Sequence, residues 1–188
     1  VPFVGSDVGG YSGNASAELF VRWLQVGAMS PFARAHVTSG VPGQEPWMFG
    51  QEALDISRVM LRDRYALLPL WESLFAEHTH TGAPVLRPLA WAFPDDPNAL
   101  LADTEFLIGD HLLISPVVAV GETTHTTYLP AGTWFDSASG AMFHGPVSLS
   151  QPITLAALPR FVHEGGIVPT LPAATSTADL SHCLLYTS

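Results

Sequence analysis

The pattern of apolar residues changes partway along the chain, and this change constrains the fold more than any other feature. Up to about residue 110 the order is a short apolar strand at Val1–Val4, a helix, an irregular stretch rich in Pro and Gly, a second helical stretch and another strand. That alternation is typical of α/β organisation. After about Leu112, short apolar runs separated by Gly, Pro and Ser predict a small all-β unit. We expect the boundary between Asp103 and Leu113.

Local signals place the elements of the first part. Ser16 is the predicted N-cap of a helix that runs to about Met29. Helical periodicity returns over residues 51–79, where Pro69 should kink or divide the helix. The apolar run Pro84–Phe93 predicts a second buried strand.

Composition excludes several classes of partner. The chain has 188 residues and a net charge of -10, and its seven basic residues are all arginines without a cluster. This balance argues against binding to nucleic acid or to anionic membrane surfaces. No uninterrupted apolar run reaches the roughly 18 residues of a membrane span. The lone Cys183 excludes an internal disulfide, and the opening on Val1 suggests a cut through a longer fold.

The glycine-flanked stretch SDVGGYSG, from Ser6 to Gly13, places an acid beside bare backbone. Its spacing matches neither the dinucleotide nor the P-loop pattern, and no Lys follows to offset Asp7. A carboxylate next to an aromatic ring such as Tyr11 suits a neutral polyol, whose hydroxyls donate to the acid and whose C–H faces pack on the ring. The alternative is that Asp7 only forms an Asx turn.

A second polar cluster lies in the irregular stretch from residue 31 to 47. In an extended segment Arg34 and His36 project to the same side, and a neutral imidazole can both donate and accept a hydrogen bond. We therefore expect His36 to contact a sugar hydroxyl. The alternative is structural: Arg34 would pair with Glu45, and His36 would only pack.

Other candidate motifs are weaker. His78 and His80 are two residues apart, so on a helix they point away from each other and do not share a metal. The sequence has no H-E-x-x-H, Cys pair or G-x-S-x-G, so we expect neither a metal site nor a serine nucleophile, and no cofactor. Trp47 and Trp91 are expected in the core rather than as platforms for a sugar.

Several longer motifs resemble one known family. They are GSDVGGYSG, ELFVRWLQVGAMSPFARAH, QEPWMFG, RYALLPLWESLF, TGAPVLRPLAWAFP, GDHLLISPVV, YLPAGTWFD and FVHEGGIVP. Together they resemble glycoside hydrolase family 31, the retaining α-glucosidases and their relatives, over about residues 1–169. The resemblance implies the C-terminal portion of a (β/α)8 TIM barrel over residues 1–110, followed by part of an all-β sandwich domain over residues 111–170. Strand seven would be Val1–Ser6 and strand eight Pro84–Phe93, whereas residues 171–188 would be a non-family tail, disordered or non-native.

The resemblance also implies a function. Asp7, Tyr11 and His36 fall on family positions that line the subsite for the glucose to be released. The two catalytic aspartates of the family belong to motifs on earlier barrel strands, which do not occur here, so no catalytic residue is assigned in this chain. We expect a fragment of an exo-acting α-glucosidase that acts on oligosaccharides or glycans.

Three alternatives stay open. Two belong to the same family, a transglucosylase and an α-xylosidase, and the third is a non-catalytic carbohydrate-binding module. The RAH, HGPVSL and ALPRF motifs are similar to those of the family's glycan-trimming branch, which would imply a regulatory subunit as partner. Family members occur in the cytoplasm, the lysosome, the ER lumen and outside the cell, so the compartment stays open.

Overall fold

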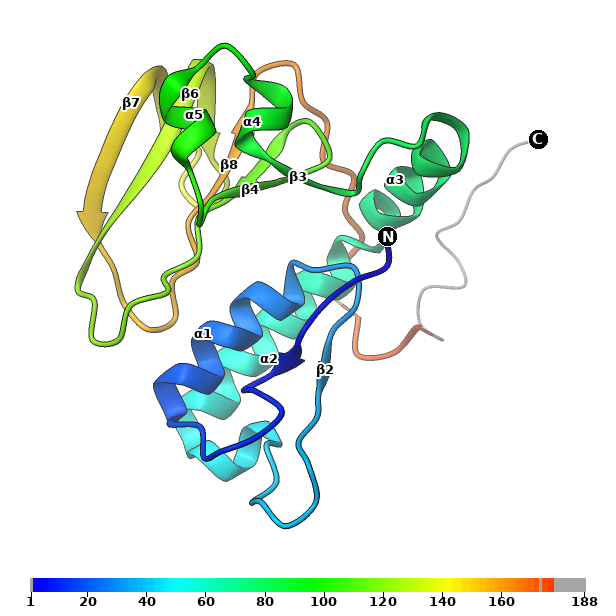
Figure 1. Ribbon diagram of the computed structural model, residues 1–188, viewed down its shortest axis with the longest axis vertical. Helices are drawn as coiled ribbons and strands as arrows, with labels where there is room; N and C mark the ends of the chain where they lie inside the picture. The colour runs from blue at the N-terminus through cyan, green and yellow to red at the C-terminus, as the bar shows by residue number, and fades with distance from the viewer. Residues whose placement is uncertain (1, 173, 178–188) are drawn as a thin grey trace.

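The computed structural model describes residues 2–172 and 174–177, and it consists of a helical half and a sheet half (Figure 1). In chain order the elements are β1 (Asp7–Val8), α1 (Ala17–Ala28), β2 (Arg34–Ala35), a 3-10 helix (Pro46–Phe49), α2 (Gln51–Ala66), α3 (Leu68–Thr81), β3 (Leu86–Pro88), α4 (Leu89–Ala92), α5 (Pro97–Leu101), β4 (Phe106–Ile108), β5 (Leu112–Ile114), β6 (Thr124–Asp136), β7 (Met142–Pro152) and β8 (Arg160–His163).

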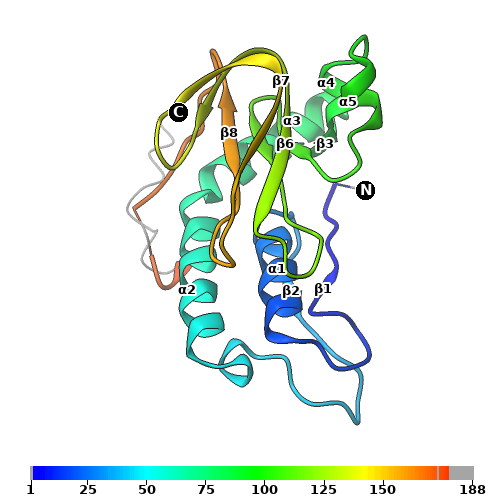
Figure 2. The same ribbon diagram turned by 90° about the vertical axis from the view of Figure 1, so that its left-hand side faces the viewer.

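Helices α1 and α2 lie side by side, with the short strand β1 along α1 (Figure 2). The Ser16 hydroxyl accepts the backbone N–H of Leu19 at 3.1 Å, which confirms the predicted N-cap of α1. The second helical stretch is divided as predicted. Leu67 separates α2 from α3, and Pro69 occupies the first turn of α3, where its missing N–H costs no helical hydrogen bond.

One guanidinium closes the end of α1. Arg64 of α2 donates to the carbonyl oxygens of Ala28, at 3.0 Å, and of Pro31, at 2.8 Å, and also to that of Ser30. These carbonyls have no helical partner, because they lie at or beyond the last turn of α1. Burial lowers the pKa of Arg64 from its ordinary value. The contact therefore fixes the path by which the chain leaves α1 and enters β2.

The strands β1 and β2 form a two-stranded parallel sheet, in which Asp7 is opposite Arg34 and Val8 is opposite Ala35. As strands seven and eight of a barrel, Val1–Ser6 and Pro84–Phe93 should be neighbouring parallel strands. This expectation is wrong over the described residues: Pro2 and Val4 line one pocket with Val85, but residues 2–6 form no strand and do not pair with residues 84–93.

Two features of the structure explain the error. Leu86–Pro88 pairs antiparallel with β4 in the other sheet, and the next four residues form α4. A short apolar run cannot distinguish a strand from a buried helical turn by periodicity. The actual neighbour of β1 carries no apolar signal, because both residues of β2 are exposed.

The larger sheet has six strands in the order β3-β4-β5-β8-β6-β7, all antiparallel to their neighbours. Its central strands are apolar on both faces. Leu107 and Leu113 pack with α4 and α5, whereas Ile108 and Ile114 belong to the core that α1, α2 and α3 share. The sheet is therefore continuous with the helical half through a common core.

Polar contacts also join the two halves. From α1, Arg22 donates to the carbonyl oxygen of Ala157 at 3.2 Å, and Gln25 donates to that of Leu155 at 2.8 Å. Arg160 of β8 forms an ion pair with Asp63 of α2, with 2.9 Å between Nη1 and Oδ2. Main-chain acceptors and one ion pair thus fix the sheet against the helices.

The described structure already pairs β3 and β4 with the later strands, so its all-β part includes residues that the sequence analysis placed in the barrel. The exact residue at which one domain passes into the other stays a prediction. Of the predicted tail, residues 173 and 178–188 lie outside the described residues, and Leu171 donates its N–H to the carbonyl of Ala66. Among the described helices, none has the length and apolarity that crossing a membrane requires.

Candidate functional site

The loop after β1 is shaped by two glycines. Gly9 and Gly10 have φ values of 86° and 91°, a region that side-chain-bearing residues rarely adopt, and Gly10 donates its N–H to the carbonyl of Asp7 at 3.0 Å. A Cβ atom on Gly9 would lie 2.0 Å from Oε1 of Gln44. The turn thus needs glycine for its conformation and for the approach of Gln44.

The parallel pairing of β1 and β2 brings Asp7 next to Arg34. The Nε atom of Arg34 donates to Oδ1 of Asp7 at 2.6 Å, and the Asp7 side chain is 19% exposed. The alternative in which Arg34 pairs with Glu45 is wrong: Arg34 pairs with Asp7, because the two residues are opposite each other in the β1–β2 register. Oδ1 of Asp7 is therefore fixed by Arg34.

Tyr11 and His36 also lie together. Their ring centroids are 5.7 Å apart with the planes tilted by 34°, and both residues are exposed. The carbonyl of Tyr11 accepts the N–H of Thr38 at 2.8 Å, which ties the β1 loop to the segment after β2. All three predicted site residues, Asp7, Tyr11 and His36, thus lie on two adjoining segments held by β1–β2 pairing.

Two further side chains, which are not among the predicted site residues, support this arrangement. Gln44 is buried and donates to the carbonyl of Gly10 at 3.0 Å, while Trp23 of α1 donates to the Ser6 hydroxyl at 2.6 Å. Gln44 is the first residue of the QEPWMFG motif, and Trp23 lies within the ELFVRWLQVGAMSPFARAH motif. The available signal was thus their place in segments that resemble the family. The residue types alone do not indicate these roles, because Gln44 lies in an irregular stretch and Trp23 fits an apolar position on α1.

A pocket of about 220 Å³ opens beside these residues. His36, Gln44 and Glu45 line it, together with Ala35, Val37 and Gly43. The two tryptophans expected in the core are both exposed: Trp47, next to this pocket in sequence, by 65% and Trp91 by 55%. For these two residues the core prediction is wrong.

The donors and acceptors of this cluster suit a neutral, hydroxyl-rich ligand. Asp7 offers an acceptor, His36 offers one donor and one acceptor when neutral, and Tyr11 offers an aromatic face. Arg34 offsets the charge of Asp7, so the pair does not present a strong field to a charged ligand. Among the described residues, no group of three or more His, Cys, Asp or Glu side chains could hold a metal ion.

In the sheet half, a serine, a histidine and a glutamate are hydrogen-bonded in the same sequence as in a hydrolase triad. The Ser115 hydroxyl lies 2.9 Å from Nε2 of His125, whose Nδ1 lies 3.1 Å from Oε1 of Glu122, and Thr127 donates to the same serine. Ser115 is fully buried, so no substrate reaches its oxygen. The network satisfies polar groups inside the sheet half and is not a candidate active site.

The chain is similar to known proteins along most of its length. Residues 1–74 match the model of the glycosyl hydrolases family 31 TIM-barrel domain, and residues 82–168 match that of the family 31 C-terminal domain. The chain is 42% identical over 172 residues to neutral alpha-glucosidase C of Mus musculus, which covers 90% of this chain and 19% of the relative.

Solved structures of the family are similar as well. A family 31 dextranase from Flavobacterium johnsoniae, complexed with isomaltotriose, has a TM-score of 0.88 and 37% identity, covering 92% of this chain and 22% of that one. A family 31 alpha-xylosidase from a soil metagenome, complexed with xylose, has a TM-score of 0.81 and 28% identity, covering 89% of this chain and 28% of that one. The chain spans about a fifth of the length of the curated relative. With both domain models matched in order along its length, the chain belongs to glycosyl hydrolase family 31.

Proposed function

We propose that this chain is part of a retaining, exo-acting α-glucosidase and that it supplies one side of the subsite for the glucose to be released. The observation that carries the proposal is the grouping of Asp7, Tyr11 and His36 on the paired β1 and β2 segments, with Arg34 fixing Asp7. The α-glucosidase relative at 42% identity supports the reaction class.

Each of the three residues has a separate role in this proposal. The Asp7 oxygen that is not bound to Arg34 accepts a bond from a sugar hydroxyl, and His36 donates to or accepts from a second hydroxyl. The Tyr11 ring packs against a C–H face of the pyranose. These contacts hold the ring as it flattens towards the oxocarbenium-like transition state, so they act on catalysis as well as on binding.

The catalytic pair is proposed to lie outside this chain. Retaining glycosidases need a nucleophile and an acid/base, with their carboxyl groups roughly 5–5.5 Å apart. The carboxylate of the β1–β2 site, Asp7, is engaged by Arg34 through Oδ1 and is assigned to substrate. The 188-residue chain alone is therefore expected to give no turnover of an aryl α-glucoside above a buffer control, and turnover would refute this assignment.

The whole protein that contains this chain tests the function directly. It is incubated with aryl α-glucoside, aryl α-xyloside and short α-linked gluco-oligosaccharides, and the first product anomer is followed by NMR. Release of glucose with retained α configuration is expected. Preference for the xyloside would favour the second candidate, an α-xylosidase, which the similarity to a structure of that activity supports.

Two other outcomes of the same assay decide between the remaining alternatives. Transfer of glucose to an acceptor sugar in place of water would identify a transglucosylase. Binding without turnover of any substrate would identify a carbohydrate-binding module. A regulatory subunit is proposed only for the glycan-trimming branch of the family, and co-purification of a second polypeptide with the whole protein tests it.

A further inference from the structure

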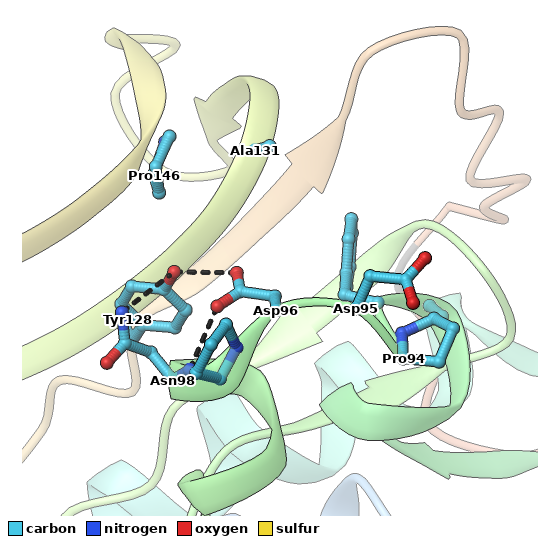
Figure 3. Close-up of a pocket in the computed structure, with 10 residues that line it drawn as sticks. Pro94, Asp95, Asp96, Asn98, Tyr128, Ala131 and Pro146 are labelled. Atoms are coloured by element: carbon cyan, nitrogen blue, oxygen red, sulfur yellow. Dashed lines mark hydrogen bonds between the residues drawn. The ribbon is translucent and has the colours of Figure 1, made fainter.

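A larger pocket lies in the sheet half, away from the β1–β2 site. It has a volume of about 590 Å³ and is formed by the turn between α4 and α5 on one side and the β6–β7 hairpin on the other (Figure 3). In Figure 1 these elements occupy the opposite end of the molecule from β1 and β2. None of Asp7, Tyr11 and His36 lines this pocket. Its volume falls within the ~300–1,000 Å³ that is typical of small-molecule sites.

The walls of the pocket are rigid and largely apolar. Phe93 and Tyr128 contribute rings, and Pro94, Pro97 and Pro146 contribute flat faces with few internal rotations. Little conformational entropy is lost when such a surface binds a ligand. Flat apolar faces of this kind fit the C–H faces of a pyranose.

The polar groups of the pocket are held in a fixed order. Tyr128 donates its hydroxyl to Oδ2 of Asp96 at 2.6 Å, and Oδ1 of Asp96 accepts the backbone N–H of Asn98 at 2.9 Å. The Asn98 side chain in turn donates to the Tyr128 oxygen at 3.5 Å. Figure 3 shows Asp96 and Tyr128 turned toward each other beneath Ala131 and Pro146. The bond from Tyr128 lowers the pKa of Asp96, so the acceptor stays ionised.

The charged side chains that line the pocket favour a neutral ligand over an anionic one. Its lining contains two carboxylates, Asp95 and Asp96, and no Lys or Arg, so an anionic ligand is disfavoured. Two carboxylates are too few for a divalent cation, and among the described residues no group of three or more His, Cys, Asp or Glu side chains could hold a metal ion. A neutral ligand with many hydroxyls and apolar C–H faces can pack on the rings of Phe93 and Tyr128 and donate hydrogen bonds to the carboxylates.

We propose that this pocket is a second carbohydrate-binding site that holds an α-linked gluco-oligosaccharide at a distance from the β1–β2 site. The choice of sugar rests on the proposed function, whereas the position and chemistry of the pocket do not. Such a site would keep a longer substrate at the surface between successive cleavages.

The test uses the whole protein and one blocking substitution. Ala131→Trp places a large ring in the pocket from an exposed position on β6, and Thr126→Trp places the same ring at another exposed position of that strand, outside the pocket lining. Binding to a cyclic α-1,4-linked and to a cyclic α-1,6-linked gluco-oligosaccharide, which have no chain end for an exo-acting enzyme to cleave, is measured by titration calorimetry, together with kcat/KM on an aryl α-glucoside and the Tm of each variant. The two sugars distinguish the linkage that the pocket prefers.

The expected result is binding to at least one oligosaccharide that Ala131→Trp weakens at least tenfold and Thr126→Trp leaves unchanged, with kcat/KM on the aryl glucoside unaltered by either. Unchanged oligosaccharide binding in Ala131→Trp would overturn the proposal. An equal loss of oligosaccharide binding in Thr126→Trp would also overturn it, because the loss would then not depend on the pocket. Activity on the aryl glucoside reports the β1–β2 site, so a failure of the proposed function is visible separately.

Discussion

Replacement of Asp7 tests the site most directly, because the structure separates its two bonds. One carboxylate oxygen accepts Nε of Arg34 at 2.6 Å, and the other is assigned to a sugar hydroxyl. Loss of a hydrogen bond to a charged group costs ~1.5–3 kcal/mol. At about 1.36 kcal/mol for each tenfold change in rate, Asp7→Ala should lower kcat/KM by roughly 10- to 150-fold.

The effect on stability should be much smaller. The Asp7–Arg34 pair is partly open to solvent, with exposed side-chain fractions of 19% and 50%, so its loss should cost no more than about 1 kcal/mol. Asp7→Asn should fall between the wild type and Asp7→Ala in kcat/KM, because an amide keeps an acceptor but loses the charge. The predicted signature is therefore a large kinetic loss in a protein that melts close to the wild type.

The assay measures kcat/KM on an aryl α-glucoside and Tm on the same samples of the whole protein. Asp55→Ala is the matched control, since Asp55 forms a solvent-exposed pair with Arg58 at 2.6 Å on the outside of α2. It should leave kcat/KM unchanged. Wild-type kinetics in a well-folded Asp7→Ala protein would remove Asp7 from the site. A lower Tm with intact kinetics would make Asp7 only a turn former.

Three further predictions follow from individual contacts. Gly9→Ala should lower kcat/KM by tenfold or more, because a Cβ there meets Gln44 and the backbone has φ of 86°; a wild-type value would refute the role of this turn. Arg64→Met should lower the free energy of unfolding by about 2–4 kcal/mol in denaturant titration, since it leaves several carbonyls without a partner, whereas Arg58→Met at an exposed position should not. The hydrogen bond from Tyr128 lowers the pKa of Asp96 in the folded state, so the stability from this bond is present above the ordinary Asp pKa and is lost as the pH falls through the lowered value. In Tm measured against pH, the curves of the wild type and Tyr128→Phe should therefore converge only in strong acid. Parallel curves would refute the linkage.

The sequence predicted best what local physics decides. Ser16 as N-cap and Pro69 as the divider of two helices are confirmed, because capping and the missing proline N–H act within one or two turns. The change to an all-β unit is confirmed for the same reason, since alternating short runs with turn residues specify β6 and β7. These features need no knowledge of distant contacts.

The strand partner of β1 could not be predicted from apolar pattern. Arg34 and Ala35 form β2 with only two residues, both exposed, while the strongly apolar run at Pro84–Phe93 is divided between a three-residue strand and a helix. The roles of Gln44 and Trp23 were missed because both depend on the path of the chain in three dimensions. The sequence did bring Asp7, Tyr11 and His36 into one hypothesis, through their chemistry and through resemblance, and their roles on substrate stay predictions.

The contact between α1 and the sheet half has a consequence for how such a chain can vary. Arg22 and Gln25 bind the carbonyl oxygens of Leu155 and Ala157, and every amino acid carries a carbonyl oxygen. Exposed neighbours such as Ala156 can therefore change identity without loss of this contact, provided that the backbone path is kept. The exposed positions of the loop between β7 and β8 are thus free to diversify while the helix that follows the Asp7 loop stays anchored. Mutational scanning should accordingly tolerate most side chains at Ala156 but reject proline and deletions there, whereas the buried Ile153 and Leu158 should tolerate few changes.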